Sequence, residues 1–318
     1  MKKMLKVVSI LFITTILLIG CADTTEQDSV ESEDTVQIVT SMFPMYEITK
    51  EIAGNRAEIS VMVGANEDAH HYEPSARAVA AVNEADIFVY SSDEMEFWVE
   101  SLLSVVENED LIVVELGEGI DFEMHSDDDH DHDDHGHGHD GHDHGNLDPH
   151  FWLNPVSVES QLTLIVDALL AVDSEGKDLY EAEAKRFSDE LLALDQAYQE
   201  AFDSATNRSF VVQHQAFGHL AHQYDLNQVA IGGLTTEVEP SPNQLAKIVE
   251  LINEQQLPII YYQSGESSTI AETIANETST EIGVLYDLES MPAAFENADQ
   301  PYLDAMKENL NQLKLSIQ

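Results

Sequence analysis

The chain is nearly without cysteine, since Cys21 is the only one in 318 residues. A single thiol excludes an intramolecular disulfide and any zinc site built on several cysteines. Basic residues are also scarce: 13 Lys and Arg stand against 61 Asp and Glu, and none lies between residues 78 and 176. The formal charge of −48 repels nucleic acid and anionic lipid headgroups, which excludes both as binding partners. The same charge attracts cations.

A long hydrophobic run is missing too, because the most apolar stretch, residues 7–19, is too short to span a bilayer. Three lysines precede it and Leu-Ile-Gly-Cys follows, so residues 1–20 are predicted to be an export signal. The Leu-Ile-Gly-Cys sequence resembles the bacterial lipobox, which implies that Cys21 carries a lipid and anchors the mature chain on the extracytoplasmic face of the membrane. Residues 21–35 are acidic and aperiodic, and predict a flexible tether to that anchor.

Histidine is concentrated in one segment. Residues 124–147 hold eight of the 14 histidines together with eight aspartates, and no Lys or Arg. A stretch this polar has no apolar face to bury, so we expect a mobile loop. Solubility would need only Asp and Glu, whereas imidazole and carboxylate together are the ligand set of divalent zinc and its neighbours. The segment therefore indicates that the protein handles a transition metal.

Strand-like and helix-like patterns alternate from residue 36 onward, which predicts an α/β fold with parallel sheets flanked by helices. The predicted strands are 36–40, 59–63, 87–90, 111–116, 210–213, 229–231, 259–263 and 282–286. The predicted helices include 45–53, 75–84, 95–106, 155–172, 177–204 and 300–316. We expect two similar lobes, 36–172 and 207–318, joined by a long helix within 173–206.

Six histidines lie outside the His- and Asp-rich segment. His70 and His214 follow predicted strands, and His150 lies just ahead of a predicted helix. Ligands of open α/β sheets bind beyond the carboxyl ends of the strands, where such loops converge. Three histidines with one carboxylate would form a four-coordinate site of three nitrogens and one oxygen. His219 and His222 are interpreted as structural or surface residues.

Four motifs give the chain a resemblance. They are Asp-Ala-His-His-Tyr-Glu-Pro-Ser at 68–75, Asp-Pro-His-Phe-Trp-Leu-Asn-Pro at 148–155, His-Gln-Ala-Phe at 214–217 and Glu-Pro-Ser-Pro at 239–242. In this order they resemble the zinc-binding receptors of bacterial zinc and manganese ABC importers. The resemblance implies two α/β lobes bridged by one long helix, with Zn²⁺ in the cleft and an ABC-importer permease as partner. It also implies ligands at His70, His150 and His214. His219 stands where the family pattern has an aromatic residue.

The resemblance implies that the fourth ligand is a carboxylate from the last strand–helix loop. Leu-Glu-Ser-Met at 288–291 is similar to the ending of some zinc receptors and favours Glu289. Asp287 matches the position of the aspartate in manganese relatives and stays the alternative.

Three other functions compete with a zinc receptor. A manganese receptor is disfavoured, because manganese does better with more oxygen ligands. A zinc hydrolase needs an open position for water, and no His-Glu-x-x-His helix, Gly-x-Ser-x-Gly elbow or Gly-rich phosphate loop is present. A surface adhesin fits the lipid anchor but gives the histidines no purpose. We expect a monomeric receptor that is not an enzyme.

Overall fold

The structure is a computed structural model that describes residues 35–65, 67–122, 147–234 and 240–318. The predicted export signal, the tether with Cys21 and residues 124–146 of the His- and Asp-rich segment lie outside the described residues. The compact unit that holds the fold is Thr35–Gln318.

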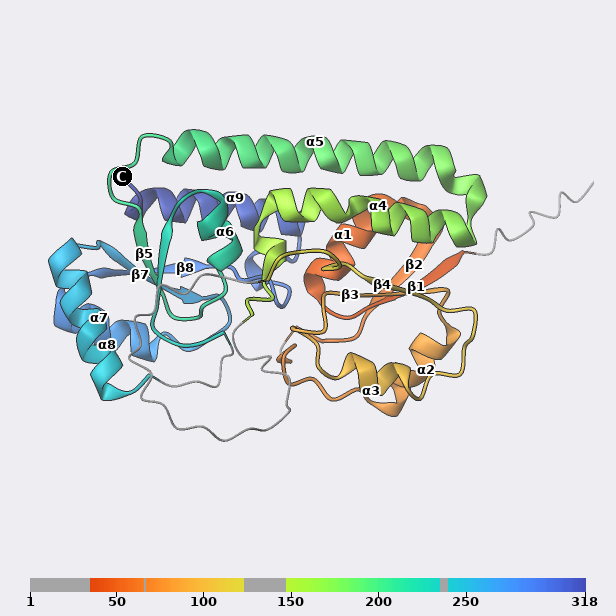
Figure 1. Ribbon diagram of the computed structural model, residues 1–318, viewed down its shortest axis with the longest axis horizontal. Coiled ribbons are helices and arrows are strands. Elements are labelled where there is room, and N and C mark those ends of the chain that lie inside the picture. The colour runs from red at the N-terminus through yellow and green to blue at the C-terminus, as the bar shows by residue number, and fades with distance from the viewer. Residues whose placement is uncertain (1–34, 66, 123–146, 235–239) are drawn as a thin grey trace, which may run out of the picture. The chain divides into compact units, whose positions relative to one another are not determined.

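The first half of this unit is built on a four-stranded parallel sheet in the order β2-β1-β3-β4 (Figure 1). Its strands are β1 Val36–Thr40, β2 Ala57–Val61, β3 Ile87–Tyr90 and β4 Ile112–Glu115. The helices between them are α1 Phe43–Ala53, α2 Ala76–Glu84 and α3 Val99–Leu103. Parallel neighbours need crossover connections, and the helices supply them.

The second half repeats the arrangement, with a parallel sheet in the order β6-β5-β7-β8. Its strands are β5 Ser209–Val212, β6 Asn227–Ala230, β7 Ile259–Gln263 and β8 Glu281–Leu285. Its helices are α6 Gly218–Gln223, α7 Pro242–Gln255, α8 Thr269–Thr278 and α9 Pro301–Ser316. The predicted fold class, α/β with two parallel-sheet lobes flanked by helices, is confirmed.

The central strands of both sheets are buried on both faces, as is usual in parallel sheets covered by helices. All four residues of β3 (Ile-Phe-Val-Tyr) and of β5 (Ser-Phe-Val-Val) are buried. A strand buried on both faces reads as a continuous apolar run and not as an alternation, and helices must then cover both sides of the sheet. The edge strand β2 instead has three exposed residues among its five.

Two helices lie between the sheets in the sequence. Helix α4 (Pro155–Val172) begins with a proline and is capped by the Asn154 side chain, which accepts a hydrogen bond from Val156 N. It is also long and apolar enough to cross a membrane, but here seven of its residues are buried in the protein. Helix α5 (Lys177–Phe202) has 26 residues, and at 1.5 Å per residue it is about 39 Å long.

The long helix α5 packs on both halves. It contacts α1 and α4 of the first half and α9 of the second, as Figure 1 shows along its length. Its buried residues recur at intervals of three, four or seven positions and form one apolar stripe: Tyr180, Phe187, Leu191, Leu194, Tyr198 and Phe202. The hydroxyl of Tyr198 donates to Met306 O at 2.8 Å. Apolar packing is therefore continuous beneath α5 from one sheet to the other.

The predicted elements are found with ends shifted by at most about two residues, except for one helix. The expected helix 95–106 is wrong in extent, because only α3 (Val99–Leu103) is helical. Glu96 is the reason: its carboxylate turns back to accept hydrogen bonds from Ser91 N at 2.8 Å and Ser92 N at 3.0 Å. This buried contact holds the chain in turns after β3 and delays the start of the helix.

Candidate metal centre

Four strand ends supply one cluster of side chains. His70 follows β2, His150 follows β4 through the long connection, His214 lies two residues after β5, and Glu289 lies four residues after β8. All four come from loops at the carboxyl ends of parallel strands, where the loops of an open α/β sheet form its binding crevice. Among the described residues, these four form the group of ligand-type side chains whose contact atoms all lie within 4.8 Å of one another.

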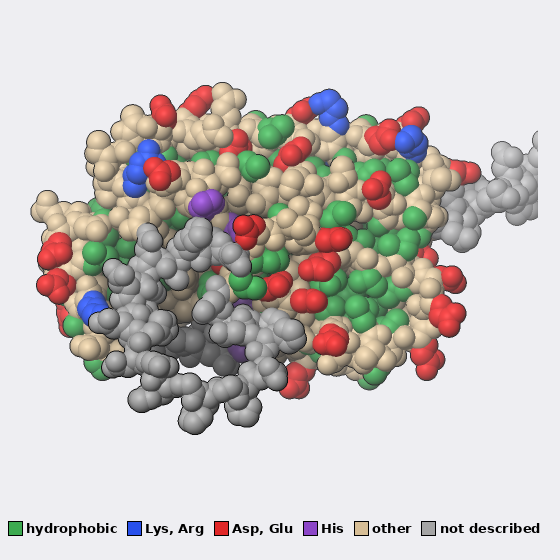
Figure 2. Space-filling model, in the orientation of Figure 1, with side chains coloured by type: hydrophobic (Ala, Val, Ile, Leu, Met, Phe, Trp, Pro, Cys, Tyr) green, Lys and Arg blue, Asp and Glu red, His purple; other side chains and the backbone are tan. Residues whose placement is uncertain are grey.

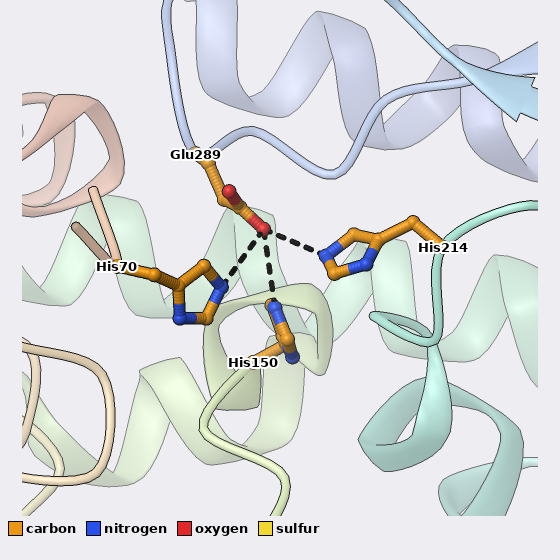
Figure 3. A group of neighbouring side chains, drawn as sticks. All are labelled: His70, His150, His214 and Glu289. Atoms are coloured by element: carbon orange, nitrogen blue, oxygen red, sulfur yellow. Dashed lines mark hydrogen bonds and ion pairs between the residues drawn. The ribbon is translucent and has the colours of Figure 1, made fainter. Parts of the chain in front are cut away.

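The three imidazoles converge on one carboxylate oxygen (Figure 3). Glu289 Oε1 lies 2.9 Å from His214 Nε2, 3.1 Å from His150 Nε2 and 3.7 Å from His70 Nε2. The rings are steeply inclined to one another, for example 82° between His150 and His214. The side chains are 0–3% exposed for the histidines and 12% for Glu289.

These distances fit a tetrahedral zinc ion. Zinc–nitrogen and zinc–oxygen bonds of ~2.0–2.1 Å place the ligand atoms of a tetrahedron about 3.3 Å apart. The three separations fall on both sides of that value, so small side-chain movements would accommodate the ion. His70 Nε2 gives a second indication, since it is buried and has no hydrogen-bond partner among the described residues. A buried nitrogen without a partner lowers the stability of the fold unless a metal ion or a proton binds to it.

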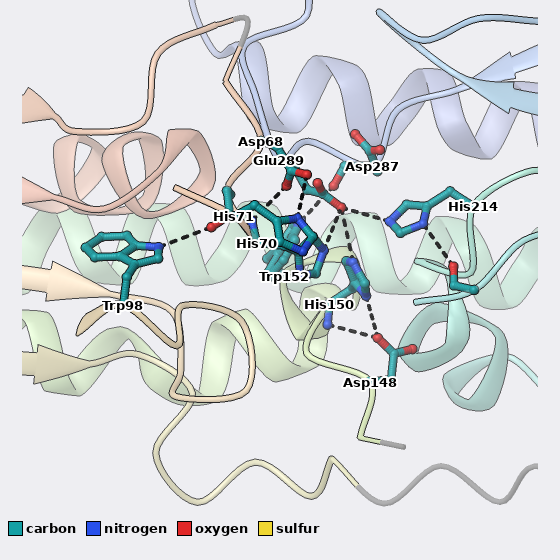
Figure 4. A network of polar contacts seen from close by, with 12 residues as sticks. Asp68, His70, His71, Trp98, Asp148, His150, Trp152, His214, Asp287 and Glu289 are labelled. Carbon is teal, nitrogen blue, oxygen red and sulfur yellow. Dashed lines mark hydrogen bonds and ion pairs between the residues drawn. The ribbon is translucent and has the colours of Figure 1, made fainter. Parts of the chain in front are cut away.

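Hydrogen bonds on the far side of two rings fix which nitrogen faces the cluster (Figure 4). His150 Nδ1 donates to Asp148 Oδ1 at 2.6 Å, and His214 Nδ1 donates to Gly233 O at 3.2 Å. Each bond places the proton on Nδ1 and leaves the Nε2 lone pair for the metal. Asp148 also accepts from His150 N at 3.0 Å, so one carboxylate orients both the backbone and the ring of His150.

The cluster is electrostatically prepared for a cation. Burial lowers the pKa of His150, but the charge and hydrogen bond of Asp148, together with Glu289, outweigh it and raise the pKa to about 10. Burial raises the pKa of Glu289, but hydrogen bonds from His150 and His214 hold it well below its usual range. Positive charge at these nitrogens is thus favoured, and zinc would take the place of a proton there.

The loop that carries Glu289 is held from three sides. Leu288 is fully buried and has a φ of 65°, a left-handed conformation that is uncommon for leucine and turns the chain between Asp287 and Glu289. Trp152 Nε1 donates to Asp287 O at 2.7 Å, and the Asn309 side chain bonds to both backbone groups of Tyr286. The carboxylate of Glu289 is therefore presented to the histidines by a fixed turn.

The geometry favours Glu289 over Asp287, because Asp287 is not among the four grouped side chains. Its carboxyl is buried nearby, and burial raises its pKa to about 7, with a further contribution from the charge of Glu289. On the face seen in Figure 2, acidic side chains far outnumber Lys and Arg. A bound cation would stabilise the ionised form of the buried Asp287 carboxyl and would offset part of the negative charge around it.

The remaining described histidines lie outside the group of four, and His219 and His222 are a structural and a surface residue, as the sequence suggested. His71 lies beside the cluster with its side chain 46% exposed, and pairs with Asp68 at 2.9 Å. His222 is exposed on α6. His219, on the same helix, is only 7% exposed and therefore structural, since its Nε2 lies 2.7 Å from Asp148 O.

Sequence reasoning missed the residues that orient the ligands, above all Asp148 and Trp152. A signal was present in the motifs: Asp68 and Asp148 each stand two residues before a histidine of the cluster. In both places the aspartate accepts from the backbone N–H of that histidine, at 2.9 Å and 3.0 Å. An aspartate that bonds two residues ahead is a common turn-forming arrangement, so the repeated Asp-x-His could have indicated two similarly built loops.

Comparison with known proteins agrees with this arrangement. Residues 38–315 match the family model described as zinc-uptake complex component A, periplasmic. The high-affinity zinc uptake system protein ZnuA of Bacillus subtilis is 35% identical over 303 residues, which is 95% of this chain and 94% of that protein. The zinc-binding lipoprotein AdcA of Streptococcus pneumoniae is 35% identical over 308 residues, but the match covers only 58% of its length.

Solved structures show the same fold. The Zn(II)-bound ZnuA-like domain of S. pneumoniae AdcA has a TM-score of 0.74 and 34% identity, covering 89% of this chain and 98% of that one. The laminin-binding protein Lmb of Streptococcus agalactiae, described as bifunctional with adhesin and metal transporting activity, has a TM-score of 0.75 and 30% identity over 88% of this chain and 99% of that one. The family match over most of the sequence, together with the shared fold, shows that the chain belongs to the ZnuA family of zinc-uptake components.

Proposed function

We propose that this protein is an extracytoplasmic receptor that captures Zn²⁺ and delivers it to an ABC-type importer. The observation that supports the proposal most is the buried group of three imidazoles and one carboxylate, His70, His150, His214 and Glu289. Neutral imidazole nitrogens and one carboxylate oxygen at tetrahedral spacing suit zinc, whereas manganese prefers more oxygen ligands. The names of relatives in zinc uptake support the same substrate.

The same geometry argues for transport and against catalysis. A catalytic zinc keeps one coordination position for water or substrate. Here the fourth position is filled by Glu289, whose loop is fixed by Trp152 and Asn309. A site closed by four protein ligands can hold and release an ion but offers no zinc-bound nucleophile.

Capture is tested by competing the purified full chain against a calibrated zinc chelator. One tight zinc per cleft is expected, and the variant H214A should lose it because a three-ligand remnant loses geometry. Delivery is tested in cells grown in chelated medium, where the wild type should restore zinc uptake and H214A should not. Equal binding by both proteins, or equal uptake, would contradict the proposal. H71A is the matched control, since His71 lies outside the group.

We propose further that the mature chain is held to the membrane by lipidated Cys21, with residues 21–35 as its tether. The support is the lipobox-like sequence before a lone cysteine, and the naming of AdcA as a lipoprotein. The variant C21A should release the protein from the membrane fraction or block its processing. Unchanged membrane retention of a fully processed C21A protein would show that another anchor holds it.

The proposed organisation places one lobe at 36–172, the linking helix at 173–206 and the second lobe at 207–318, in a monomer that meets its permease directly. Residues 124–147 are proposed to collect zinc weakly and to raise its concentration beside the cleft. Deletion of residues 126–145 should therefore leave one tight zinc and remove the weaker ones. Loss of the tight zinc would instead mean that this segment supplies primary ligands.

Surface adhesion is the second candidate function. It is favoured by one relative, Lmb, whose description names adhesin activity together with metal transport. Binding of the purified chain to immobilised laminin, with and without zinc, tests it independently of uptake.

A further inference from the structure

His219 lies outside the ligand group, yet it joins parts of the two halves that carry two of the ligands. It belongs to α6 (Gly218–Gln223) in the second half. Its Nε2 lies 2.7 Å from Asp148 O, and its ring meets the ring of Phe122 edge to face, with centroids 6.0 Å apart at 89°. Both partners belong to the connection that leads from β4 to His150. His219 is 7% exposed and Asp148 is 2% exposed, so the contact is shielded from water.

The chemistry of this contact is defined by its acceptor. A backbone carbonyl oxygen only accepts hydrogen bonds, so His219 Nε2 must carry the proton and donate it. Asp148 N in turn donates to Phe122 O at 3.3 Å. One imidazole thus holds the chain on both sides of the segment 123–146, through the ring of Phe122 and the backbone of Asp148.

Asp148 is also the residue that orients His150. Its Oδ1 accepts from His150 Nδ1 at 2.6 Å and from His150 N at 3.0 Å. A shift of the Asp148 backbone would move this carboxylate and rotate the imidazole that it holds. Because a metal ligand must be placed within about 0.5 Å, such a shift matters at Nε2.

The other end of the contact is tied to a second ligand. Helix α6 begins at Gly218, four residues after His214, and follows directly from the loop that carries it. The hydrogen bond from His219 to Asp148 therefore spans from the His214 loop to the His150 loop. This hydrogen bond holds the imidazole rings of His150 and His214 at a set separation, with centroids 5.0 Å apart, although the two residues lie on loops of different sheets.

We propose that His219 is a positioning residue for the zinc site, which acts by holding Asp148 and, through it, the ring of His150 in register with His214. The inference rests on the proposed function for its zinc readout. The proposed role belongs to the hydrogen bond from His219 Nε2–H to Asp148 O and not to the bulk of the imidazole ring. The test must therefore remove the N–H donor and keep the ring, and the reverse.

Two substitutions separate the donor from the ring. H219F keeps an aromatic ring against Phe122 and removes the N–H, while H219Q places an amide N–H near the position of Nε2 and removes the ring. H219F should weaken zinc binding about tenfold, at the lower end of what loss of an orienting partner costs, and should speed zinc release. H219Q should recover most of the affinity. H222F and H222Q, on the exposed side of the same helix, are the matched controls and should match the wild type.

Two spectroscopic readouts address positioning directly. In metal-free protein labelled at histidine nitrogens, the His150 Nδ1–H resonance reports its bond to Asp148 and should shift in H219F but not in H219Q. In Co²⁺-substituted protein, the visible absorption bands of a tetrahedral site should change in H219F only. Thermal unfolding of the metal-free variants shows whether folding alone has changed.

Weaker zinc binding and a shifted His150 resonance in H219F, both restored in H219Q, support the inference. Wild-type affinity in H219F, equal weakening in H219F and H219Q, or a loss of thermal stability without a change at His150 would each overturn it. If the wild type itself binds no zinc, the proposed function fails, while the His150 resonance of the metal-free protein still tests the positioning role.

Discussion

At the scale of single residues, the metal centre holds groups that are unfavourable in the interior without a cation. His70 Nε2 is buried without a hydrogen-bond partner among the described residues, and the carboxyl of Asp287 is buried beside Glu289. An unsatisfied buried polar group costs roughly 1–3 kcal/mol. The fold tolerates this because Trp152, Asp148 and Gly233 hold the surrounding loops through hydrogen bonds. These groups lower the stability of the metal-free protein, and a bound metal ion would restore it.

The ligand set leads to the first prediction. Each of H70A, H150A, H214A and E289A should lower zinc affinity by at least about 100-fold, because first-coordination ligands contribute more than the 10–100-fold of their orienting partners. D287N should change affinity only a few-fold, since Asp287 is outside the group. Chelator competition measures both. A large loss in D287N with little loss in E289A would exchange the roles of the two carboxylates.

Asp148 carries the second prediction. In D148N the amide oxygen still accepts from His150, but the negative charge is gone, so zinc affinity should fall about 10–100-fold. The pH dependence should change as well. Below the raised pKa of His150, about 10, zinc must displace a proton from this residue, so wild-type affinity rises as the pH rises through neutrality.

Without the Asp148 charge the pKa of His150 falls and fewer protons compete, so the pH dependence in D148N should be flatter between pH 7 and pH 9. Titrations at several pH values in that range measure the slope. Parallel slopes for the two proteins would mean that Asp148 does not set the protonation of His150.

At the scale of elements, sequence reasoning succeeded where local signals and tertiary packing agree. Helix α4 has Pro155 at its start and β7 begins with the run Ile-Ile-Tyr-Tyr, and both are found with the predicted bounds. It failed at α3, because the Glu96 side chain reaches back to the backbone of Ser91 and Ser92, a local contact that the hydrophobic periodicity does not reveal. Sequence position also shows which histidines follow strands, but not that Asp148 and Trp152 hold their loops.

Glu96 also gives the third prediction, on stability. Complete burial raises its pKa from 4.5 to about 7, against hydrogen bonds that lower it. Below pH 4.5 the carboxyl is protonated in both folded and unfolded chains and contributes nothing. Between pH 4.5 and pH 7 the unfolded chain releases the proton first, so the free energy of unfolding falls as pH rises, by about 3 kcal/mol in all.

E96Q removes this titration, while its amide oxygen still accepts from Ser91 N and Ser92 N. Its stability relative to the wild type should therefore increase between pH 5 and pH 8. Urea unfolding at the two pH values measures the difference, with E109Q as the exposed control. A difference between E96Q and wild type that does not depend on pH would contradict the titration of Glu96.

At the scale of the whole described unit, the two halves are joined by hydrogen bonds around the metal centre as well as by packing beneath α5. Trp152 donates to Asp287 O, Tyr302 donates to Trp152 O at 2.6 Å, and His219 donates to Asp148 O. These bonds connect the loops that carry His150, His214 and Glu289, so the metal group is assembled by the packing of one half on the other. The strong negative charge of the chain then favours the arrival of cations.

The most direct test of the central claim is anomalous diffraction at the zinc edge from crystals of the full chain loaded with one equivalent of zinc. We predict one strong peak in the cleft, bonded at ~2.0–2.2 Å to Nε2 of His70, His150 and His214 and to a carboxylate oxygen of Glu289. A peak elsewhere, or zinc in the cleft with a bound water in place of Glu289, would contradict a closed capture site.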